Sequence, residues 1–215
     1  MRHCASRRST QMPPPPRPPA EQPRRSHAFE HLSAWLTSNT GLQVVDFGGV
    51  NQSNLDFLTG LGHRLYADDL LRAADHFFAA KTGQKEEERY SAANIEEFLS
   101  QTLDFPDQTI DAVLLWDTLQ YLNPALALAL VERLYRASAP DCRLLAFFQP
   151  ASPTLSGTPV SCRILDESTL ETRPRGTPRK QQTFNNRGIE KLFQRFQSVK
   201  FFLTRDHVQE VIVRR

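Results

Sequence analysis

Three groups of polar residues stand directly after short apolar runs, and their side chains are suited to hold a polar ligand. They are Asp46 with Gly48 and Gly49, the pair Asp68-Asp69, and the pair Trp116-Asp117. Carboxylates accept hydrogen bonds, and glycines let the backbone approach a ligand closely. A strand that ends in such a turn and leads into a helix brings backbone N–H groups to bear on a bound polar group. The three groups are therefore the candidate binding residues of the chain.

The elements that position these groups are predicted to be strands that alternate with helices. The expected strands are Leu42–Phe47, Arg64–Ala67, Ala112–Trp116 and Arg143–Gln149. The expected helices start at Ser26, span Asn54–Thr59, Leu70–Ala80 and Ala92–Gln101, run from Asn123 to about Ala137, and span Asn186–Phe196. Such alternation favours right-handed crossovers and a mostly parallel sheet. We predict a Rossmann-like, doubly wound, three-layer α/β/α fold that ends in an antiparallel hairpin of Val199–Leu203 and Val208–Val213.

The candidate residues follow the carboxyl ends of the first three strands. Ligands of open parallel sheets bind beyond those ends. We therefore expect all three groups on one rim of the sheet.

The first 25 residues differ in composition from the rest of the chain. They contain four consecutive prolines, Pro13–Pro16, and six arginines against one glutamate. Such a segment favours polyproline II and buries too little apolar surface to offset its ordering entropy. We expect residues 1–25 to be a disordered leader and residues 26–215 to form the folded domain. Pro13–Arg17 would also suit a proline-recognising partner domain.

Composition excludes several classes of function. Cys4, Cys142 and Cys162 are widely spaced and odd in number, so they predict neither a disulfide framework nor a zinc site. No apolar run has the roughly 18 residues that a membrane-spanning helix needs, and no secretory signal is apparent. Because the basic excess is in the leader, the domain has no clear nucleic-acid signal. A cytoplasmic protein without a metal site is the expectation.

One string carries a resemblance to a known family. Residues 105–122, FPDQTIDAVLLWDTLQYL, are similar to the fourth strand and flanking turns of the class I S-adenosylmethionine-dependent methyltransferases, especially the type 11 group. The helix before Ala139-Pro140, the strand Arg143–Phe148 and the terminal hairpin follow in family order. The resemblance covers about Phe29 to Arg215. It implies methyl transfer from S-adenosylmethionine to an unidentified acceptor.

The resemblance also assigns roles to the candidate residues. It implies that Asp46, Gly48 and Gly49 surround the methionine part of S-adenosylmethionine. Asp69, with Asp68 beside it, falls where the family binds the ribose hydroxyls. Trp116 and Asp117 fall where the cofactor and the acceptor would meet, so Asp117 either positions an acceptor or caps the following helix. No catalytic residue is assigned, because alignment of the reacting groups is the chief requirement of methyl transfer.

The chain departs from the family at two places. Val50 and Gln52 stand where the family has its second and third glycines, so we expect them to block the pocket or to lie on a displaced turn. The family often has a short strand before Phe105 that ends in an adenine-binding acid, whereas a helix is predicted here. These departures favour an alternative: a non-catalytic methyltransferase-fold protein that acts as an interaction or regulatory module. A third reading is another nucleotide-like ligand on the same rim.

Residues 150–182 contain few apolar residues and are predicted to form a long polar loop. Its basic part, Arg173 to Lys180, would attract an anionic acceptor or an acidic partner, or would simply be a solvated surface. His63 and His76 have no partner at the spacing of a catalytic triad or a metal site.

Overall fold

The computed structural model describes residues 23–81, 83–150, 156–204 and 207–215. Residues 1–22 of the expected leader, including the proline run, lie outside the described residues. The described fold already includes Arg24 and Arg25, which composition assigns to the leader. These two residues form a short strand, β1 (Arg24–Arg25), that pairs with strand β8 (Thr169–Pro174).

The central sheet confirms the predicted fold class. Its six strands run in the order β10 (Ser198–Leu203), β11 (Gln209–Arg214), β5 (Ser138–Phe148), β4 (Ile110–Trp116), β2 (Gln43–Asp46) and β3 (Arg64–Ala67). The pairs β2–β3, β2–β4 and β4–β5 are parallel, whereas β11 is antiparallel to both β5 and β10. The carboxyl ends of β2, β3 and β4 therefore meet on one rim.

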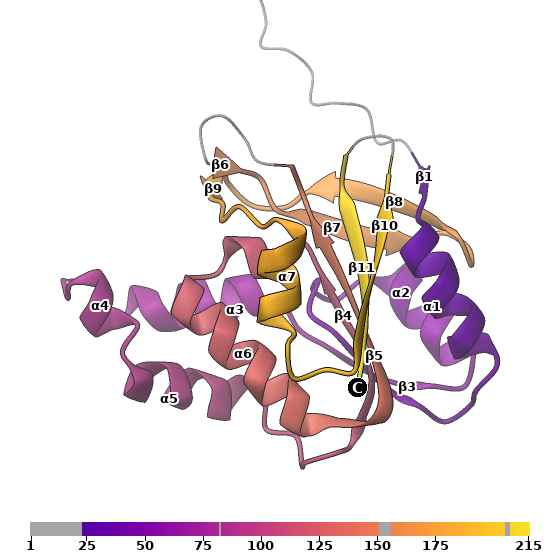
Figure 1. The fold of residues 1–215 in the computed structure, drawn as a ribbon, viewed down its shortest axis with the longest axis horizontal. Coiled ribbons are helices and arrows are strands. Elements are labelled where there is room, and N and C mark those ends of the chain that lie inside the picture. Colours follow the sequence, from indigo (N-terminus) through magenta and orange to yellow (C-terminus); the bar gives the residue numbers. More distant parts are fainter. Residues whose placement is uncertain (1–22, 82, 151–155, 205–206) are drawn as a thin grey trace, which may run out of the picture.

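Helices cover both faces of the sheet (Figure 1). One face carries α1 (His27–Thr37) and α2 (Gln52–Gly60), and the other carries α3 (Leu70–Ala79), α5 (Ala92–Thr102), α6 (Pro124–Ala137) and α7 (Asn186–Leu192). Two buried apolar clusters, one on each face, include alternate residues of the same strands, such as Val44 and Val45 of β2. This division is expected of a sheet that is buried on both faces.

Two predicted boundaries were wrong. The segment 81–90, between the predicted helices Leu70–Ala80 and Ala92–Gln101, contains the short helix α4 (Glu86–Arg89), and the single-turn helix η1 (Thr118–Tyr121) follows β4. Residues 139–142 were expected to precede the fifth strand, but they belong to β5, where a register shift against β4 accommodates Asp141 at a φ of 66°. A proline followed by a residue of positive φ usually ends a strand. Here the strand continues, because the irregular pairing with β4 accommodates both residues.

The prediction of a long polar loop at 150–182 was also wrong. Its described part contains β6 (Ser156–Gly157), β7 (Val160–Ile164), β8 and β9 (Arg179–Lys180). Strands β7 and β8 form an antiparallel hairpin, and β1 adds a third strand to it. The inward side chains of this hairpin, Cys162, Ile164 and Leu170, are buried in the cluster that contains α1 and α2. A hairpin with so few apolar residues shows little periodicity, because packing against the domain supplies most of its stability.

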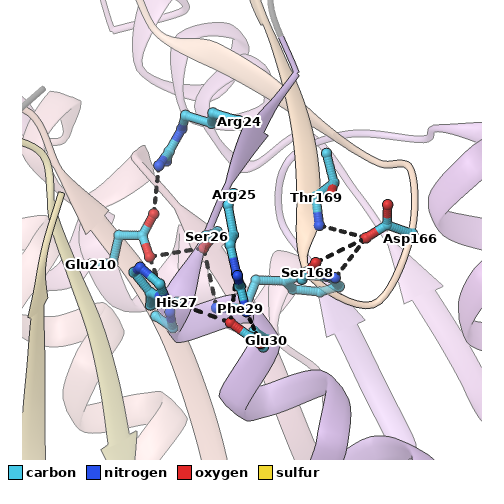
Figure 2. A network of polar contacts seen from close by, with 11 residues as sticks. Arg24, Arg25, Ser26, His27, Phe29, Glu30, Asp166, Ser168, Thr169 and Glu210 are labelled. Carbon is cyan, nitrogen blue, oxygen red and sulfur yellow. Dashed lines mark hydrogen bonds and ion pairs between the residues drawn. The ribbon is translucent and has the colours of Figure 1, made fainter. Parts of the chain in front are cut away.

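A buried carboxylate joins the start of the domain to its last strand (Figure 2). Glu210 of β11 is fully buried, and its Oε1 accepts a hydrogen bond from Arg24 Nη1 at 2.5 Å. Its Oε2 accepts from Ser26 Oγ at 2.8 Å and from the backbone N–H of Ala28 at 3.0 Å. Ser26 in turn caps α1 by accepting from Phe29 N at 3.1 Å. Because the first N–H groups of a helix have no partner within it, Glu210 completes the cap of α1.

Candidate functional site

The carboxylate of Asp46, at the end of β2, is bound entirely by the protein's own groups. Its Oδ1 accepts hydrogen bonds from Gly48 N at 2.8 Å and from Trp116 Nε1 at 2.6 Å. Its Oδ2 accepts from Asn54 Nδ2 at 2.9 Å. Burial raises the pKa of Asp46, while these three donors act in the opposite direction. Three donors at this distance satisfy a buried carboxylate, so Asp46 holds the turn together in this structure.

The two glycines of the turn are needed for different reasons. A Cβ added to Gly48 would lie 2.5 Å from Cδ1 of Trp116, so the indole ring already takes up that space. Gly49 has a φ of 91°, a left-handed conformation that L-residues rarely adopt. The sequence predicts that a ligand approaches the backbone of Gly48 closely. In the structure the Trp116 ring makes this close approach.

Val50 and Gln52 do not fill the space above the turn. Val50 is 82% exposed at the edge of the cleft and is not among the residues with positive φ. Gln52 is exposed as the first residue of α2, and its amide donates to Asp56 Oδ1 at 2.7 Å. The backbone of the turn has its positive φ at Gly49, so Val50 does not need to adopt the left-handed conformation that a β-branched residue disfavours. The turn therefore follows a path that tolerates both substitutions.

Asp69, the expected ribose-binding residue, caps α3 and pairs with an arginine. Its Oδ1 accepts from the backbone N of Arg72 at 3.0 Å and lies 2.9 Å from Arg175 Nη1. The same Nη1 donates to the carbonyl oxygen of Gly48 at 2.9 Å. Both side chains are largely shielded from solvent, which strengthens the ion pair relative to an exposed one. Arg175 thus bridges the two turns that would hold the two halves of a cofactor.

The β7–β8 hairpin is anchored to the rim by two further polar side chains. Asn54, which is buried in α2, donates to the carbonyl of Cys162 at 3.0 Å and accepts from the N–H of Ile164 at 2.8 Å. Asp117 Oδ2 accepts from the N–H of Val160 at 2.9 Å. These contacts satisfy buried backbone groups of β7, which would otherwise carry a desolvation cost. The hairpin is held over the ends of β2 and β4.

Trp116 and Asp117 are both fully buried and present no surface to a ligand. The Trp116 ring packs against Phe29 and Phe147, with ring centroids 6.4 Å and 5.6 Å away. Asp117 makes no side-chain cap to η1: its Oδ2 accepts from Val160, and its buried Oδ1 has no partner among the described residues. Contact with a cofactor or acceptor, which the sequence led us to expect, would require these side chains to move. Burial raises the pKa of Asp117 to about 7.

Asp117→Asn is expected to remove a pH dependence from the stability of the protein. The folded-state pKa of about 7 is above the ordinary value of 3.8, so the folded protein favours the protonated carboxyl. The stability that this preference contributes is fully present below about pH 4 and is lost as the pH rises through 7. The amide cannot ionise, so the free energy of unfolding of the variant should rise relative to wild type between pH 5 and pH 8, by up to about 3 kcal/mol. Urea unfolding at the two pH values measures this difference, and parallel pH profiles for the two proteins would contradict it.

Four of the predicted residues line an open cleft of about 730 Å³. Gly48, Gly49, Asp68 and Asp69 form part of its wall, together with Val50 and Arg175. Asp68 Oδ1 accepts from the N–H of Asp69 at 2.7 Å. Asp46, Trp116 and Asp117 do not line the cleft. The structure thus separates the seven candidate residues into an accessible group and a buried group.

Sequence reasoning missed the residues that close the site. Arg175 was noted only as one of several basic residues in a loop, and Asn54 only as the start of a helix. A buried asparagine early in α2 and one of several basic residues after a hairpin carry no local signal that distinguishes them. Their partners are distant in sequence, since the Arg175–Gly48 contact spans 127 positions.

Within the described part of the chain, no group of three or more His, Cys, Asp or Glu side chains could hold a metal ion. No helix among the described residues combines the length and the hydropathy that a bilayer crossing requires.

Comparisons with known proteins give matches at the level of structure only. No family model matches the sequence, and no curated protein matches it. The PH0226 protein from Pyrococcus horikoshii OT3 superposes with a TM-score of 0.52 at 13% identity, over 87% of this chain and 88% of that one. A SAM-dependent methyltransferase from Archaeoglobus fulgidus gives 0.50 at 12% identity, over 87% and 94%. A protein from Sulfolobus solfataricus described as a type 11 methyltransferase gives 0.48 at 15% identity, over 86% and 90%.

The first two of these matches extend over 87% of the chain, which includes the central six-stranded sheet with its antiparallel end. At such low identity the likeness concerns the fold and carries no activity with it. The chain has the fold of the class I S-adenosylmethionine-dependent methyltransferases.

Proposed function

We propose that this protein is a non-catalytic methyltransferase-fold protein that acts as a binding or regulatory module. The observation that carries the proposal is the position of Arg175, which pairs with Asp69 and donates to the carbonyl of Gly48. A guanidinium at this point takes one oxygen of the carboxylate that would bind ribose hydroxyls, and it lies between the two cofactor-binding turns.

The other rim residues support the same conclusion. S-adenosylmethionine carries an ammonium group that would need a free acceptor near Asp46, but all three hydrogen bonds to that carboxylate come from internal donors. The position that a Cβ of Gly48 would take is occupied by the Trp116 ring. The residues present do not fit the methionine half of the cofactor, and β7 is bonded to Asn54 and Asp117 at the same rim.

A second candidate, methyl transfer from S-adenosylmethionine, is favoured by the open cleft. Gly48, Gly49, Asp68 and Asp69 still line an accessible space, and Val50 and Gln52 leave it open. In that case Arg175 would have to move out of the space between the two turns before the methionine half of the cofactor could bind.

Titration with S-adenosylmethionine and S-adenosylhomocysteine separates the two candidates. We expect neither ligand, at millimolar concentration, to raise the melting temperature of the wild-type protein, because a ligand stabilises the folded state only if it binds that state. Arg175→Ala is expected to leave this result unchanged, since Trp116 would still fill the methionine half. The matched control is Arg163→Ala in β7. Arg163 pairs with Glu171 and does not line the cleft.

Stabilisation of the wild-type protein by several degrees would overturn the proposal. Stabilisation of Arg175→Ala alone would show that the arginine closes a functional cofactor site.

A further inference from the structure

The cleft is large enough for a small ligand and continues into a second hollow. Its volume is about 730 Å³, and the neighbouring hollow is about 360 Å³. Both are lined by Asp69, Arg72 and Arg175. Small-molecule sites are commonly concave spaces of ~300–1,000 Å³ with a few placed polar groups.

Three cationic or protonatable side chains line this cleft. Arg72 and His76 are four residues apart on α3, so they lie on the same face of that helix. Arg175 reaches the cleft from the segment after β8. Arg72 and His76 are exposed, and in the described part of the chain neither side chain makes a hydrogen bond or an ion pair. The Nη2 group of Arg175 is enclosed and has no partner there. Exposed donors therefore stand on the α3 wall of the cleft, whereas the unpartnered donor of Arg175 is enclosed and would have to be uncovered to reach a ligand.

Two carboxylates provide acceptors at the floor of the same cleft. Asp68 and Asp69 each use Oδ1 in the hydrogen bonds described above, and their Oδ2 atoms accept none from the described residues. A carboxylate oxygen is a suitable acceptor for a sugar hydroxyl. In dinucleotide-binding sheets, an acidic residue about 20 positions after the glycine turn binds the ribose 2′-hydroxyl, or a nearby arginine accommodates a phosphate that replaces this hydroxyl. Asp69 and Arg72 have this relation to Gly48 and Gly49.

The charges in the cleft distinguish between ligand classes. Asp69 is neutralised by Arg175, so Asp68 stands against Arg72 and the titratable His76. A sulfonium compound brings positive charge to this cleft and gains nothing from the two arginines. A phosphate group brings negative charge and three or more acceptor oxygens, which guanidinium groups bind well.

We propose that the cleft binds a phosphorylated ribonucleoside, with the ribose hydroxyls on Asp68 and Asp69 and the phosphate between Arg72, His76 and Arg175. This inference rests on the proposed function and names the ligand class of the module. Val50 and Ala73 supply the apolar part of the wall that a base would contact.

Calorimetric titration of the full chain with adenosine 5′-diphosphate, adenosine and inorganic phosphate tests the proposal. We expect the diphosphate to bind at least about tenfold more tightly than adenosine, because charge-assisted hydrogen bonds to the phosphate are added. Arg72→Gln should weaken diphosphate binding by about tenfold and leave adenosine binding unchanged. Because Arg72 is exposed and its side chain has no partner in the described residues, this variant should fold normally. Arg136→Gln is the matched control, since Arg136 is an exposed residue at the end of α6, outside the cleft.

Each outcome decides the matter. Equal affinity for adenosine and its diphosphate, or phosphate binding as tight as that of the diphosphate, would overturn the ligand class. Absence of all binding would overturn this inference and leave the non-catalytic proposal standing. Tight binding of S-adenosylmethionine together with weak binding of the diphosphate would overturn both.

Discussion

Trp116→Ala is expected to lower the free energy of unfolding by about 3–5 kcal/mol, one of the two largest effects we predict. The side chain is fully buried between Phe29 and Phe147, and its Nε1 donates to Asp46. Truncation would leave a cavity next to a buried carboxylate that has lost one donor. Equilibrium unfolding in urea, followed by circular dichroism, measures the loss.

Two further variants make this prediction specific. Trp116→Phe keeps most of the packing and removes the N–H donor, so we expect a loss of about 1–3 kcal/mol. Trp35→Ala is the matched control: Trp35 is only partly buried, and its ring packs under the guanidinium of Arg143. It should cost less than Trp116→Ala. If Trp116→Ala cost under about 1 kcal/mol, the residue would be free to serve a ligand instead of the core.

Glu210→Ala is expected to cost about 3–5 kcal/mol, because it leaves the buried partners of a carboxylate without their acceptor. Arg24, Ser26 Oγ and the Ala28 N–H all donate to Glu210, and their loss would uncap α1 and release β1 (Figure 2). The free energy of unfolding from urea titration is again the measurement. Glu210→Gln keeps two acceptor positions on one oxygen and should be less damaging.

The control for Glu210 is an exposed glutamate. Glu132 pairs with Arg195 at 2.6 Å, and both side chains are substantially exposed. Glu132→Ala should change the free energy of unfolding by less than about 1 kcal/mol, as solvent-exposed ion pairs do. Comparable losses in the two variants would mean that burial does not set the contribution of Glu210.

The network around Glu210 bears on function as well as on stability. It fixes β1 against β8, and β8 leads to Arg175. The hairpin that covers the rim is therefore attached to the domain at both of its edges: through β1 on one side and through Asn54 and β7 on the other. A closed rim is consistent with a module that binds ligands in the outer cleft only.

The sequence alone determined the layer architecture and the position of the rim. Local sequence patterns are sufficient to predict that strands and helices alternate and that the apolar strands are buried on both faces. Such patterns can be read in any short stretch of the sequence. The string at residues 105–122 placed β4, and the ends of β2, β3 and β4 then had to meet. The left-handed residue of the first turn was also readable in principle, because Gly49 is the residue that can adopt it.

Only the tertiary structure decided what occupies that rim. Whether Asp46 faces a ligand or Trp116, and whether Asp69 pairs with an arginine, depends on contacts across 70 and 106 positions. Such contacts leave no hydrophobic periodicity in the sequence. A single hydrogen bond from a distant side chain changes what a site can bind, while every helix and strand stays the same. The hairpin at 160–174 was missed for the same reason: its few buried side chains are stable only against the completed domain. The fold of this protein is thus encoded locally, whereas the occupancy of its site is a property of the assembled chain.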